Sequence, residues 1–273
     1  MDSSRVDTVF AGSVPAVYEK YLVPLIFQPY AEDIARRVAA LRPSQVLELA
    51  AGTGVVTRAL ASSLPATVAI TATDLNQAML DEAAARGTAR PVAWRQADAM
   101  HLPFEDGSFD VVVCQFGVMF FPDKAAAFVE ARRVLTPGGT FLFSVWDRLE
   151  ENEVPDVVTR ALESIFPDNP PRFMARVPHG YHHPETIRRD LAAGGFPASP
   201  GIETVAARSR ASSARAAAVA FCQGTPLRNE IEARDATALE RATTVSTQAI
   251  VERFGAGPVD ARIQAQVVTT RRD

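Results

Sequence analysis

The stretch at residues 46–54, Val-Leu-Glu-Leu-Ala-Ala-Gly-Thr-Gly, constrains the fold of this chain more than any other. Its apolar residues favour a strand covered on both faces, which is typical of parallel sheets in α/β proteins. Gly52 and Gly54 follow where the backbone must turn sharply and something must approach it closely. A helix is predicted over residues 55–62, so the turn offers unpaired N–H groups at a helix N-terminus. The sequence therefore predicts a nucleotide-type site at this turn.

The turn departs from the fingerprint of dinucleotide-binding proteins. That fingerprint places a third glycine three residues after the second, and this chain has Thr57 there. It also leaves no place for Glu48 inside the strand, because a carboxylate repels a pyrophosphate. A carboxylate suits a ligand that carries positive charge, and S-adenosylmethionine has an amino group and a sulfonium but no phosphate. The sign of the charge therefore favours S-adenosylmethionine over a nicotinamide cofactor.

Two further acidic residues follow predicted strands. Residues 67–73 are rich in β-branched side chains, and Asp74 stands at the carboxyl end of this strand, where doubly wound sheets bind ligands. An aspartate there can accept hydrogen bonds from both ribose hydroxyls. Asp98 follows a third strand, which begins at Val92, and can accept a hydrogen bond from an adenine amino group. Helix capping for Asp74 and a plain turn role for Asp98 are the structural alternatives.

Five motifs in this order resemble the class I S-adenosylmethionine-dependent methyltransferases, in particular the methyltransferase type 11 or ubiquinone/menaquinone-biosynthesis-like group. They are ELAAGTG at 48–54, TDLN at 73–76, QADA at 96–99, FDVVVCQFG at 109–117 and RVLTPGGTF at 133–141. The resemblance covers residues 15–147 and fades beyond them. One departure is Ala50, which stands where the family's turn usually has its first glycine.

The resemblance implies a set of cofactor contacts. Glu48 would hold the methionine part of the cofactor indirectly, Gly52 the methionine backbone and Asp74 the ribose. Asp98 would bind the adenine amino group, and residues 115–117 would line the methionine end and the acceptor mouth. The predicted cofactor-binding residues are Glu48, Ala50, Gly52, Gly54, Asp74, Leu75, Met79, Ala97, Asp98, Ala99, Gln115, Phe116, Gly117 and Tyr21.

The resemblance also implies a fold and an activity. The fold is α/β, a Rossmann-like, doubly wound sheet of seven mostly parallel strands with the last strand antiparallel, plus helical cap insertions. The activity is methyl transfer from S-adenosyl-L-methionine to a small organic acceptor, with S-adenosyl-L-homocysteine as the product. The alternative is a protein that binds these two compounds without catalysis. A nicotinamide oxidoreductase would require a glycine at position 57 and no Glu48.

A single domain, 1–273, is expected, because a chain of this length with 47% apolar composition can bury a large core. Its N-terminal helical segment is residues 15–41 and its cofactor-binding core is residues 42–147. Cap insertions are expected at 148–200, where prolines interrupt short helices, and at 208–258.

Two predicted helices, residues 212–222 and 227–254, fill the second insertion between strands at 202–207 and 263–270. The insertion is therefore expected to form a lid. Apolar side chains suit a small aromatic or prenylated acceptor, although Phe120 or Phe121 can equally belong to the core. The candidate pocket residues are Phe116, Met119, Phe120, Phe121, Phe166, Phe173, Met174 and Phe221.

No catalytic residue is assigned from the sequence. Methyl transfer needs a nucleophile held near an activated carbon, so a dedicated base is optional. If the acceptor is a phenol, hydroxyl or amine, the candidate proton acceptors are His179, His182 and His183 in the predicted cap. They can equally be surface or helix-capping residues. No carboxylate or cysteine completes a metal site at short spacing, so no metal is predicted.

Composition limits the partners. The net charge of −4 gives no basic footprint for nucleic acid, and no apolar run is long enough to span a membrane. Residues 1–7 lack an apolar signal region, so a cytoplasmic protein is expected. Cys114 and Cys222 have neither zinc-site spacing nor a disulfide framework and are expected to be buried thiols. The predicted partners are a small-molecule methyl acceptor and a possible homodimer.

Overall fold

The computed structural model describes residues 14–197 and 199–273. The prediction that residues 1–7 lack a signal region concerns residues outside these ranges. The described chain forms two compact units, whereas the sequence predicts one domain with insertions. We call Tyr30–Trp146, Tyr181–Val205 and Ala265–Asp273 the sheet unit. The helical unit comprises residues 14–29, Asp147–Gly180 and Ala206–Gln264.

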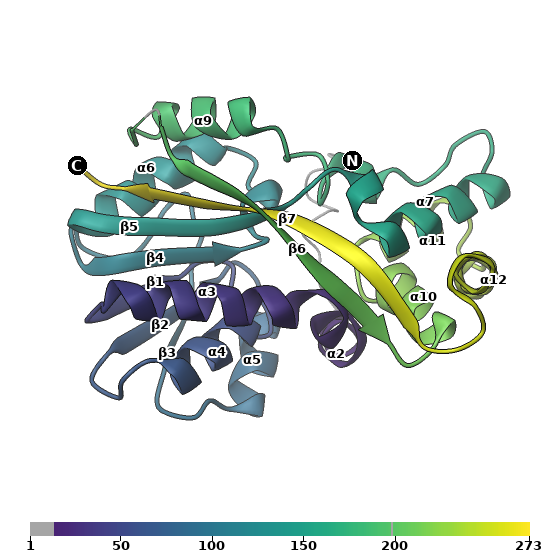
Figure 1. Cartoon of the computed structure of the whole chain (residues 1–273), viewed down its shortest axis with the longest axis horizontal. Helices are drawn as coiled ribbons and strands as arrows, with labels where there is room; N and C mark the ends of the chain where they lie inside the picture. The colour runs from purple at the N-terminus through teal and green to yellow at the C-terminus, as the bar shows by residue number, and fades with distance from the viewer. Residues whose placement is uncertain (1–13, 198) are drawn as a thin grey trace. The chain divides into compact units, whose positions relative to one another are not determined.

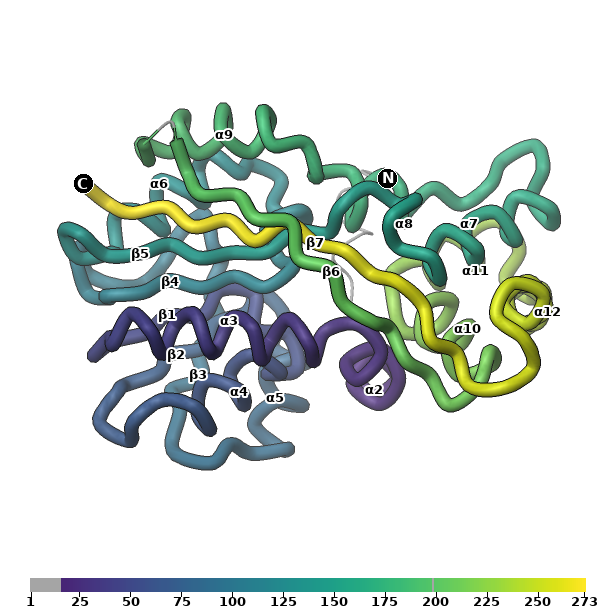
Figure 2. Tube along the Cα trace, viewed as in Figure 1, coloured from purple at the N-terminus to yellow at the C-terminus, as the bar shows by residue number. Residues whose placement is uncertain are grey.

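Seven strands form one sheet in the order β3-β2-β1-β4-β5-β7-β6. They are β1 (Gln45–Glu48), β2 (Ala69–Asp74), β3 (Ala93–Gln96), β4 (Phe109–Gln115), β5 (Leu135–Trp146), β6 (Gly201–Ala211) and β7 (Val259–Arg271). The pairs formed among β1 to β5 are parallel, and β7 runs antiparallel to β5. The trace in Figure 2 shows β7, in yellow, beside β5. The predicted fold class is confirmed.

Helices cover the sheet in its own unit. They are α3 (Gln28–Leu41), α4 (Val55–Ser63), α5 (Gln77–Arg86), α6 (Lys124–Val134) and α9 (Pro184–Ala193), with a short 3-10 turn, η2 (Val118–Phe120), before α6. In Figure 1, α3 runs in front of the sheet and α6 lies behind β5. The central strands are buried on both faces, as the apolar run from Val111 to Cys114 requires. The carboxyl ends of β1, β2 and β4 therefore emerge from a rigid core.

Short polar side chains set where these helices begin. Asn76 caps α5 by accepting a hydrogen bond from the N–H of Ala78 at 3.1 Å. Asp123 caps α6 in the same way through the N–H of Ala126 at 2.9 Å. Gly87 ends α5 with a φ of 73°, a conformation that glycine adopts at no steric cost. These caps fix the chain directions at the ends of β2 and β4.

Helix α9 lies where the sequence analysis expects a cap. The prolines around it suggested that it belongs to the insertion at 148–200, but in the structure it packs on α6 in the sheet unit. Ile187 and Leu191 of α9 are fully buried, and Gly194 approaches Phe128 so closely that no Cβ fits. Pro184 opens the helix at a position where a missing N–H costs nothing. Of the insertion expected at 148–200, only the residues up to Gly180 belong to the helical unit.

The helical unit joins segments that are far apart in the sequence. Its elements are α2 (Val14–Val17), the π-helix η1 (Tyr18–Phe27), η3 (Leu149–Glu151), α7 (Glu153–Ile165), α8 (Phe173–Arg176), α10 (Ala214–Gln223), α11 (Leu227–Arg234) and α12 (Leu239–Phe254). Helix α10 packs on η1 and α12, and α12 packs on α7. None of the helices in the described chain is long and apolar enough to cross a membrane.

The helix predicted over residues 227–254 is interrupted in the structure. Asp235 follows α11, and its Oδ1 accepts hydrogen bonds from the N–H and the hydroxyl of Thr237 at 2.9 and 2.7 Å. Such a turn competes with the helical hydrogen bonds of the backbone, so α12 begins only at Leu239. The π-helix η1 contains Pro24, which lacks an N–H and cannot continue an α-helical ladder.

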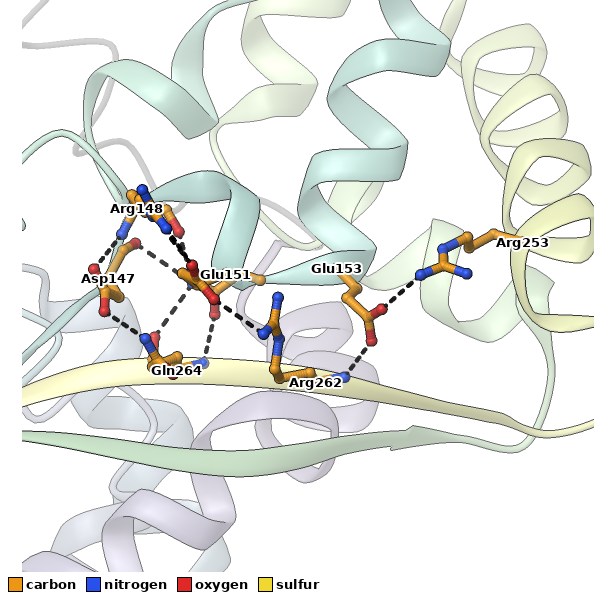
Figure 3. A network of polar contacts seen from close by, with 8 residues as sticks. Asp147, Arg148, Glu151, Glu153, Arg253, Arg262 and Gln264 are labelled. Carbon is orange, nitrogen blue, oxygen red and sulfur yellow. Dashed lines mark hydrogen bonds and ion pairs between the residues drawn. The ribbon is translucent and has the colours of Figure 1, made fainter.

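A polar network ties the segment after β5 to β7 within the helical unit (Figure 3). Gln264 Nε2 donates to Asp147 Oδ2 at 2.7 Å. Asn152 Nδ2 donates to the carbonyls of Arg148 and Gln264 at 3.1 and 3.2 Å. Ion pairs extend the network outward: Arg148–Glu151, Arg262–Glu151 and Arg253–Glu153. Because Asp147 and Asn152 are buried, the network fixes the backbone directly after β5.

Candidate functional site

The turn after β1 has a left-handed backbone. Ala50, Gly52 and Gly54 have φ values of 51°, 56° and 81°. Glycine adopts this region freely, whereas an alanine there costs about 1–2 kcal/mol. The N–H of Ala51 donates to the carbonyl of Thr73 at 2.9 Å and holds the turn against β2. Ala50 therefore adopts a backbone conformation that glycine would take at lower cost.

Glu48, the last residue of β1, carries a carboxyl group that is almost fully buried. The hydroxyl of Thr57 in α4 donates to its Oε2 at 2.5 Å, and the hydroxyl of Thr73 donates to its backbone carbonyl at 2.8 Å. Burial raises the pKa of Glu48 to about 8, against the hydrogen bond from Thr57 and with the help of nearby Asp74. At neutral pH the carboxyl is therefore mostly protonated. Glu48 therefore carries the negative charge predicted from the sequence only once a bound cation favours the ionised form.

Asp74, the last residue of β2, bonds to the glycine turn. Its Oδ2 accepts the N–H of Gly52 and its Oδ1 accepts the N–H of Asn76, each at 2.8 Å. Burial raises the pKa of Asp74 above its ordinary value, and the two N–H donors act against that shift. The carboxyl group thus joins the turn after β1 to the start of α5. Each oxygen retains acceptor capacity for a further donor, such as a hydroxyl.

Asp98 lies in a more open turn after β3. Its side chain is 38% exposed, and its Oδ1 accepts the N–H of Met100 at 2.9 Å, which is the plain turn role. The N–H of Ala97 donates to the carbonyl of Asp74 at 3.0 Å, so this turn begins beside the end of β2. Leu75 after β2 is exposed and Met79 on α5 is buried. The ends of β1, β2 and β3 are therefore joined by hydrogen bonds in chain order.

Residues 115–117 continue from the end of β4 in a strained turn. Phe116 has a φ of 53°, and its N–H donates to the carbonyl of Ser144 at 3.0 Å. Its ring stacks on Trp146 with centroids 3.7 Å apart, and Tyr30 meets both rings edge-on. All three aromatic side chains are buried. Their packing holds Phe116 in a backbone conformation that a non-glycine residue rarely adopts.

Gly117 lies against the turn after β1. A Cβ at this position would lie 2.5 Å from the Cβ of Ala50 and 2.7 Å from the Sγ of Cys114, so only glycine fits. The N–H groups of Gly117 and Val118 hydrogen-bond to the Cys114 sulfur, whose pKa burial raises to about 12. Cys114 is therefore a neutral structural thiol. Its predicted burial, and that of Cys222, is confirmed.

The candidate histidines are divided between the two units. His179 is buried in the helical unit, and its Nδ1 lies 2.8 Å from the carbonyl oxygen of Asp147. His182 and His183 belong to the sheet unit, with ring centroids 4.0 Å apart. Tyr21, a candidate cofactor contact, lies in η1 of the helical unit. These positions add no support for a common proton-transfer group of the three histidines.

Thr57 is a site residue, although the dinucleotide fingerprint shows only that position 57 is not glycine. Its hydroxyl bonds to Glu48, nine positions earlier in the chain. A hydroxyl residue in the first turn of a helix that follows a glycine turn points back toward the preceding strand. A buried acid at the end of that strand was the available signal, because a buried carboxyl needs a donor.

The family model that matches this chain describes a methyltransferase domain and covers residues 47–143. The ubiquinone/menaquinone biosynthesis C-methyltransferase of Cupriavidus pinatubonensis is 40% identical over 122 residues, 41% of this chain and 49% of that protein. The malonyl-[acyl-carrier protein] O-methyltransferase of Geobacter sulfurreducens is 35% identical over 159 residues, 57% of each chain. This chain therefore matches about half the length of these curated relatives.

A solved structure of phosphoethanolamine N-methyltransferase 2 from Haemonchus contortus aligns over 98% of this chain and 59% of its own, with a TM-score of 0.61. Its sequence identity of 17% supports the fold alone. The resemblance to methyltransferases predicted from the sequence is confirmed, and the matched residues carry the glycine turn, the three acids and Gly117.

Proposed function

We propose that this chain, whose residues 47–143 match the methyltransferase domain model, transfers a methyl group from S-adenosyl-L-methionine to a small organic acceptor. The observation that carries this proposal is the buried carboxyl of Glu48 at the entry to a left-handed glycine turn. With a pKa of about 8, that carboxyl ionises when a cation binds beside it. The amino group and the sulfonium of S-adenosylmethionine are both cationic. A pyrophosphate would instead oppose ionisation of Glu48.

The residues inferred to hold the cofactor follow the strand ends of the sheet unit. We infer that Glu48 acts on the methionine part indirectly, that Gly52 contacts its backbone and that Asp74 accepts the ribose hydroxyls. Asp98 would accept the adenine amino group. The other inferred contacts in the sheet unit are Ala50, Gly54, Leu75, Met79, Ala97, Ala99, Gln115, Phe116 and Gly117. The Haemonchus contortus enzyme, which shares the fold, was solved with S-adenosylhomocysteine.

Methyl transfer requires the protein mainly to position the two reactants. The bound cofactor would supply a methyl group on a positively charged sulfur, already activated for displacement. Holding an acceptor in line with that carbon supplies about 7–11 kcal/mol through orientation and excluded solvent. The buried stack of Phe116 on Trp146 keeps the backbone at the end of β4 rigid, which suits such positioning. No dedicated base is required by this scheme.

The acceptor is inferred only as a class. The printed names of the two curated relatives give a C-methyltransferase of quinone biosynthesis and an O-methyltransferase of malonyl-[acyl-carrier protein]. They differ in the atom methylated, so neither atom is carried over to this chain. A small organic acceptor is the class that the apolar residues near the end of β4 favour. The cytoplasmic location and the possible homodimer stay predictions.

A methyl-transfer assay tests the proposal. The purified chain is incubated with S-[methyl-³H]adenosylmethionine and a panel of quinols, phenols, carboxylic acids and amines. We expect label to accumulate in one acceptor class, with an equal amount of S-adenosylhomocysteine. Asp74→Ala is the inactive variant, and Asp81→Ala on the surface of α5 is its matched control. Cofactor binding without transfer to any compound would favour the non-catalytic alternative, and absence of binding would refute the proposal.

A further inference from the structure

We propose that Lys124 is a positioning residue whose ammonium group fixes the turn at residues 118–121, here called the acceptor-side turn, and so sets the acceptor end of the site. This inference rests on the proposed function, because residues 115–117, which precede the turn, are the ones inferred to line the acceptor mouth. Lys124 is the first residue of α6 and belongs to the sheet unit, as does the turn.

The ammonium group of Lys124 contacts three groups. Its Nζ donates to the carbonyl of Phe121 at 2.9 Å and, at the longer distance of 3.4 Å, to the carbonyl of Met119. It also lies 4.8 Å from the centre of the Tyr181 ring, within the range of a cation–π interaction. Lys124 thus joins two carbonyls of the turn to an aromatic side chain that follows it by more than fifty positions.

The location is unfavourable for a cation unless these contacts compensate. The N-terminus of a helix carries a partial positive charge, which repels a lysine at its first position. Burial lowers the pKa of Lys124, and the nearby carboxylates of Asp190 and Asp123 act in the opposite direction. A charged group retained in such a place has a local partner, and the two carbonyl oxygens and the ring are the partners that the structure provides.

The choice of lysine is itself informative in this chain. Of its 28 basic residues, lysine stands at only positions 20 and 124, and all others are arginine. An ammonium is a compact point charge with three rotatable donors, whereas a guanidinium is a planar fork. Two carbonyls two residues apart, with a ring on a third side, match the compact group. We therefore do not expect an arginine at position 124 to keep all three contacts of the Lys124 ammonium group.

Backbone hydrogen bonds also hold the acceptor-side turn. The N–H of Phe120 donates to the carbonyl of Gly117 at 2.9 Å, and the N–H of Phe121 donates to the carbonyl of Val118 at 3.1 Å. The carbonyls of Met119 and Phe121 are the ones that Lys124 takes. The N–H groups of the turn are thus bonded to Gly117 and to Val118 of the turn itself, and its carbonyls are bonded to Lys124.

The contacts of Lys124 continue through Tyr181 to α9. The hydroxyl of Tyr181 donates to Asp190 Oδ2 at 3.0 Å, and this bond orients the ring beside Lys124. Gly117, which precedes the turn, lies so close to Ala50 that a Cβ would not fit between them, and this packing is independent of Lys124. Release of Lys124 should therefore affect the turn and the acceptor more than the glycine turn that is inferred to bind the cofactor.

Hydrogen exchange and kinetics on the full chain test the inference. We compare Lys124→Met and Lys124→Arg with the unaltered chain and with Arg36→Met, a matched loss of an exposed cation on α3. In Lys124→Met we expect the amides of Phe120 and Phe121 to exchange about tenfold faster, as loss of a charge-assisted hydrogen bond implies. With the acceptor found in the methyl-transfer assay, we expect its KM to rise about tenfold while cofactor affinity changes less than about twofold.

The outcomes separate this inference from the proposed function. Unchanged exchange in Lys124→Met, an unchanged acceptor KM, or an equal loss of cofactor affinity would overturn the role of Lys124. Full rescue by Lys124→Arg would overturn it too, because any cation would then suffice. Failure of the unaltered chain to bind S-adenosylmethionine would refute the proposed function and with it an acceptor role for the turn. The exchange rates would still report whether Lys124 fastens the turn.

Discussion

The hydroxyl of Thr57 lies 2.5 Å from Oε2 of Glu48, so the residue that occupies the third-glycine position of the dinucleotide fingerprint is the hydrogen-bond donor to the buried acid. The two departures from that fingerprint, an acid in the strand and no third glycine, are therefore one structural feature. A glycine at position 57 would leave the carboxyl without this donor. The hydrogen bond between Glu48 and Thr57 joins the end of β1 to the first turn of α4.

Removal of the Thr57 hydroxyl should weaken both the fold and the inferred cofactor site. In Thr57→Val the shape is kept, but the buried carboxyl loses its donor, so we expect the free energy of unfolding to fall by about 1–3 kcal/mol. Thr57→Ser restores the hydroxyl and should recover most of that loss. Urea unfolding of the three proteins measures the effect. Equal stability of the valine and serine variants would show that the hydrogen bond is unimportant.

The raised pKa of Glu48 predicts a dependence of stability on pH. Because its folded pKa of about 8 lies above the ordinary value of 4.5, Glu48 contributes stability that is fully present below pH 4.5. That contribution is lost as the pH rises through 8. We expect Glu48→Gln to flatten the unfolding free energy between pH 5 and about 8.5. Parallel curves for the two proteins would contradict the assigned pKa.

Binding of a cationic ligand should also release a proton from Glu48. Titration at pH 7 in two buffers of different ionisation enthalpy measures this release. We expect the unaltered chain to lose a fraction approaching about one proton per S-adenosylmethionine bound, since the cation favours the ionised carboxyl. Glu48→Gln should lose none. Equal proton release by the two proteins would assign it to another group.

Much of the core was predictable because its signals are local. Asn76 and Gly87 mark the ends of α5, and apolar runs bounded by turns mark the parallel strands. The acids at the ends of β1 and β2 were predictable for the same reason, since each follows its strand directly. The contact between Glu48 and Thr57 was not predictable in this way, because the dinucleotide fingerprint specifies only a glycine at position 57.

The cap was less predictable because tertiary contacts decide it. Proline density placed α9 in an insertion, but burial of Ile187 and Leu191 assigns it to the sheet unit. The break after α11 depends on Asp235. Its side chain accepts two hydrogen bonds from Thr237, whereas in a continuous helix it would point into solvent. Composition does not reveal which of two local hydrogen-bonding patterns an aspartate selects.

Close contact between the ends of β1 and β4 predicts a coupled pair of substitutions. Gly117→Ala should destabilise the chain by about 1–3 kcal/mol, because the new Cβ overlaps Ala50 and Cys114. Ala50→Gly removes one of the two overlapping atoms, so the double variant should be more stable than the sum of the single effects implies. Urea unfolding of the four proteins gives the coupling energy. A coupling energy near zero would mean that Gly117 moves away from Ala50.

Asp74 should affect both stability and cofactor affinity. In Asp74→Ala the N–H groups of Gly52 and Asn76 lose their acceptor, so we expect a loss of about 1–3 kcal/mol in unfolding free energy. If Asp74 also accepts the ribose hydroxyls, affinity for S-adenosylhomocysteine should fall by more than about tenfold. Calorimetric titration at a temperature where the variant stays folded separates the two effects. Unchanged affinity would remove the ribose assignment.

The most direct test of the central claim is calorimetric titration of the purified, unaltered chain with S-adenosylmethionine, S-adenosylhomocysteine and NADH. The charge and geometry at Glu48 predict binding of the first two compounds in the micromolar range, with Kd of about 1–100 μM, and no binding of NADH. Binding of NADH with no response to either adenosyl compound would contradict the assignment of the glycine turn to a cationic cofactor.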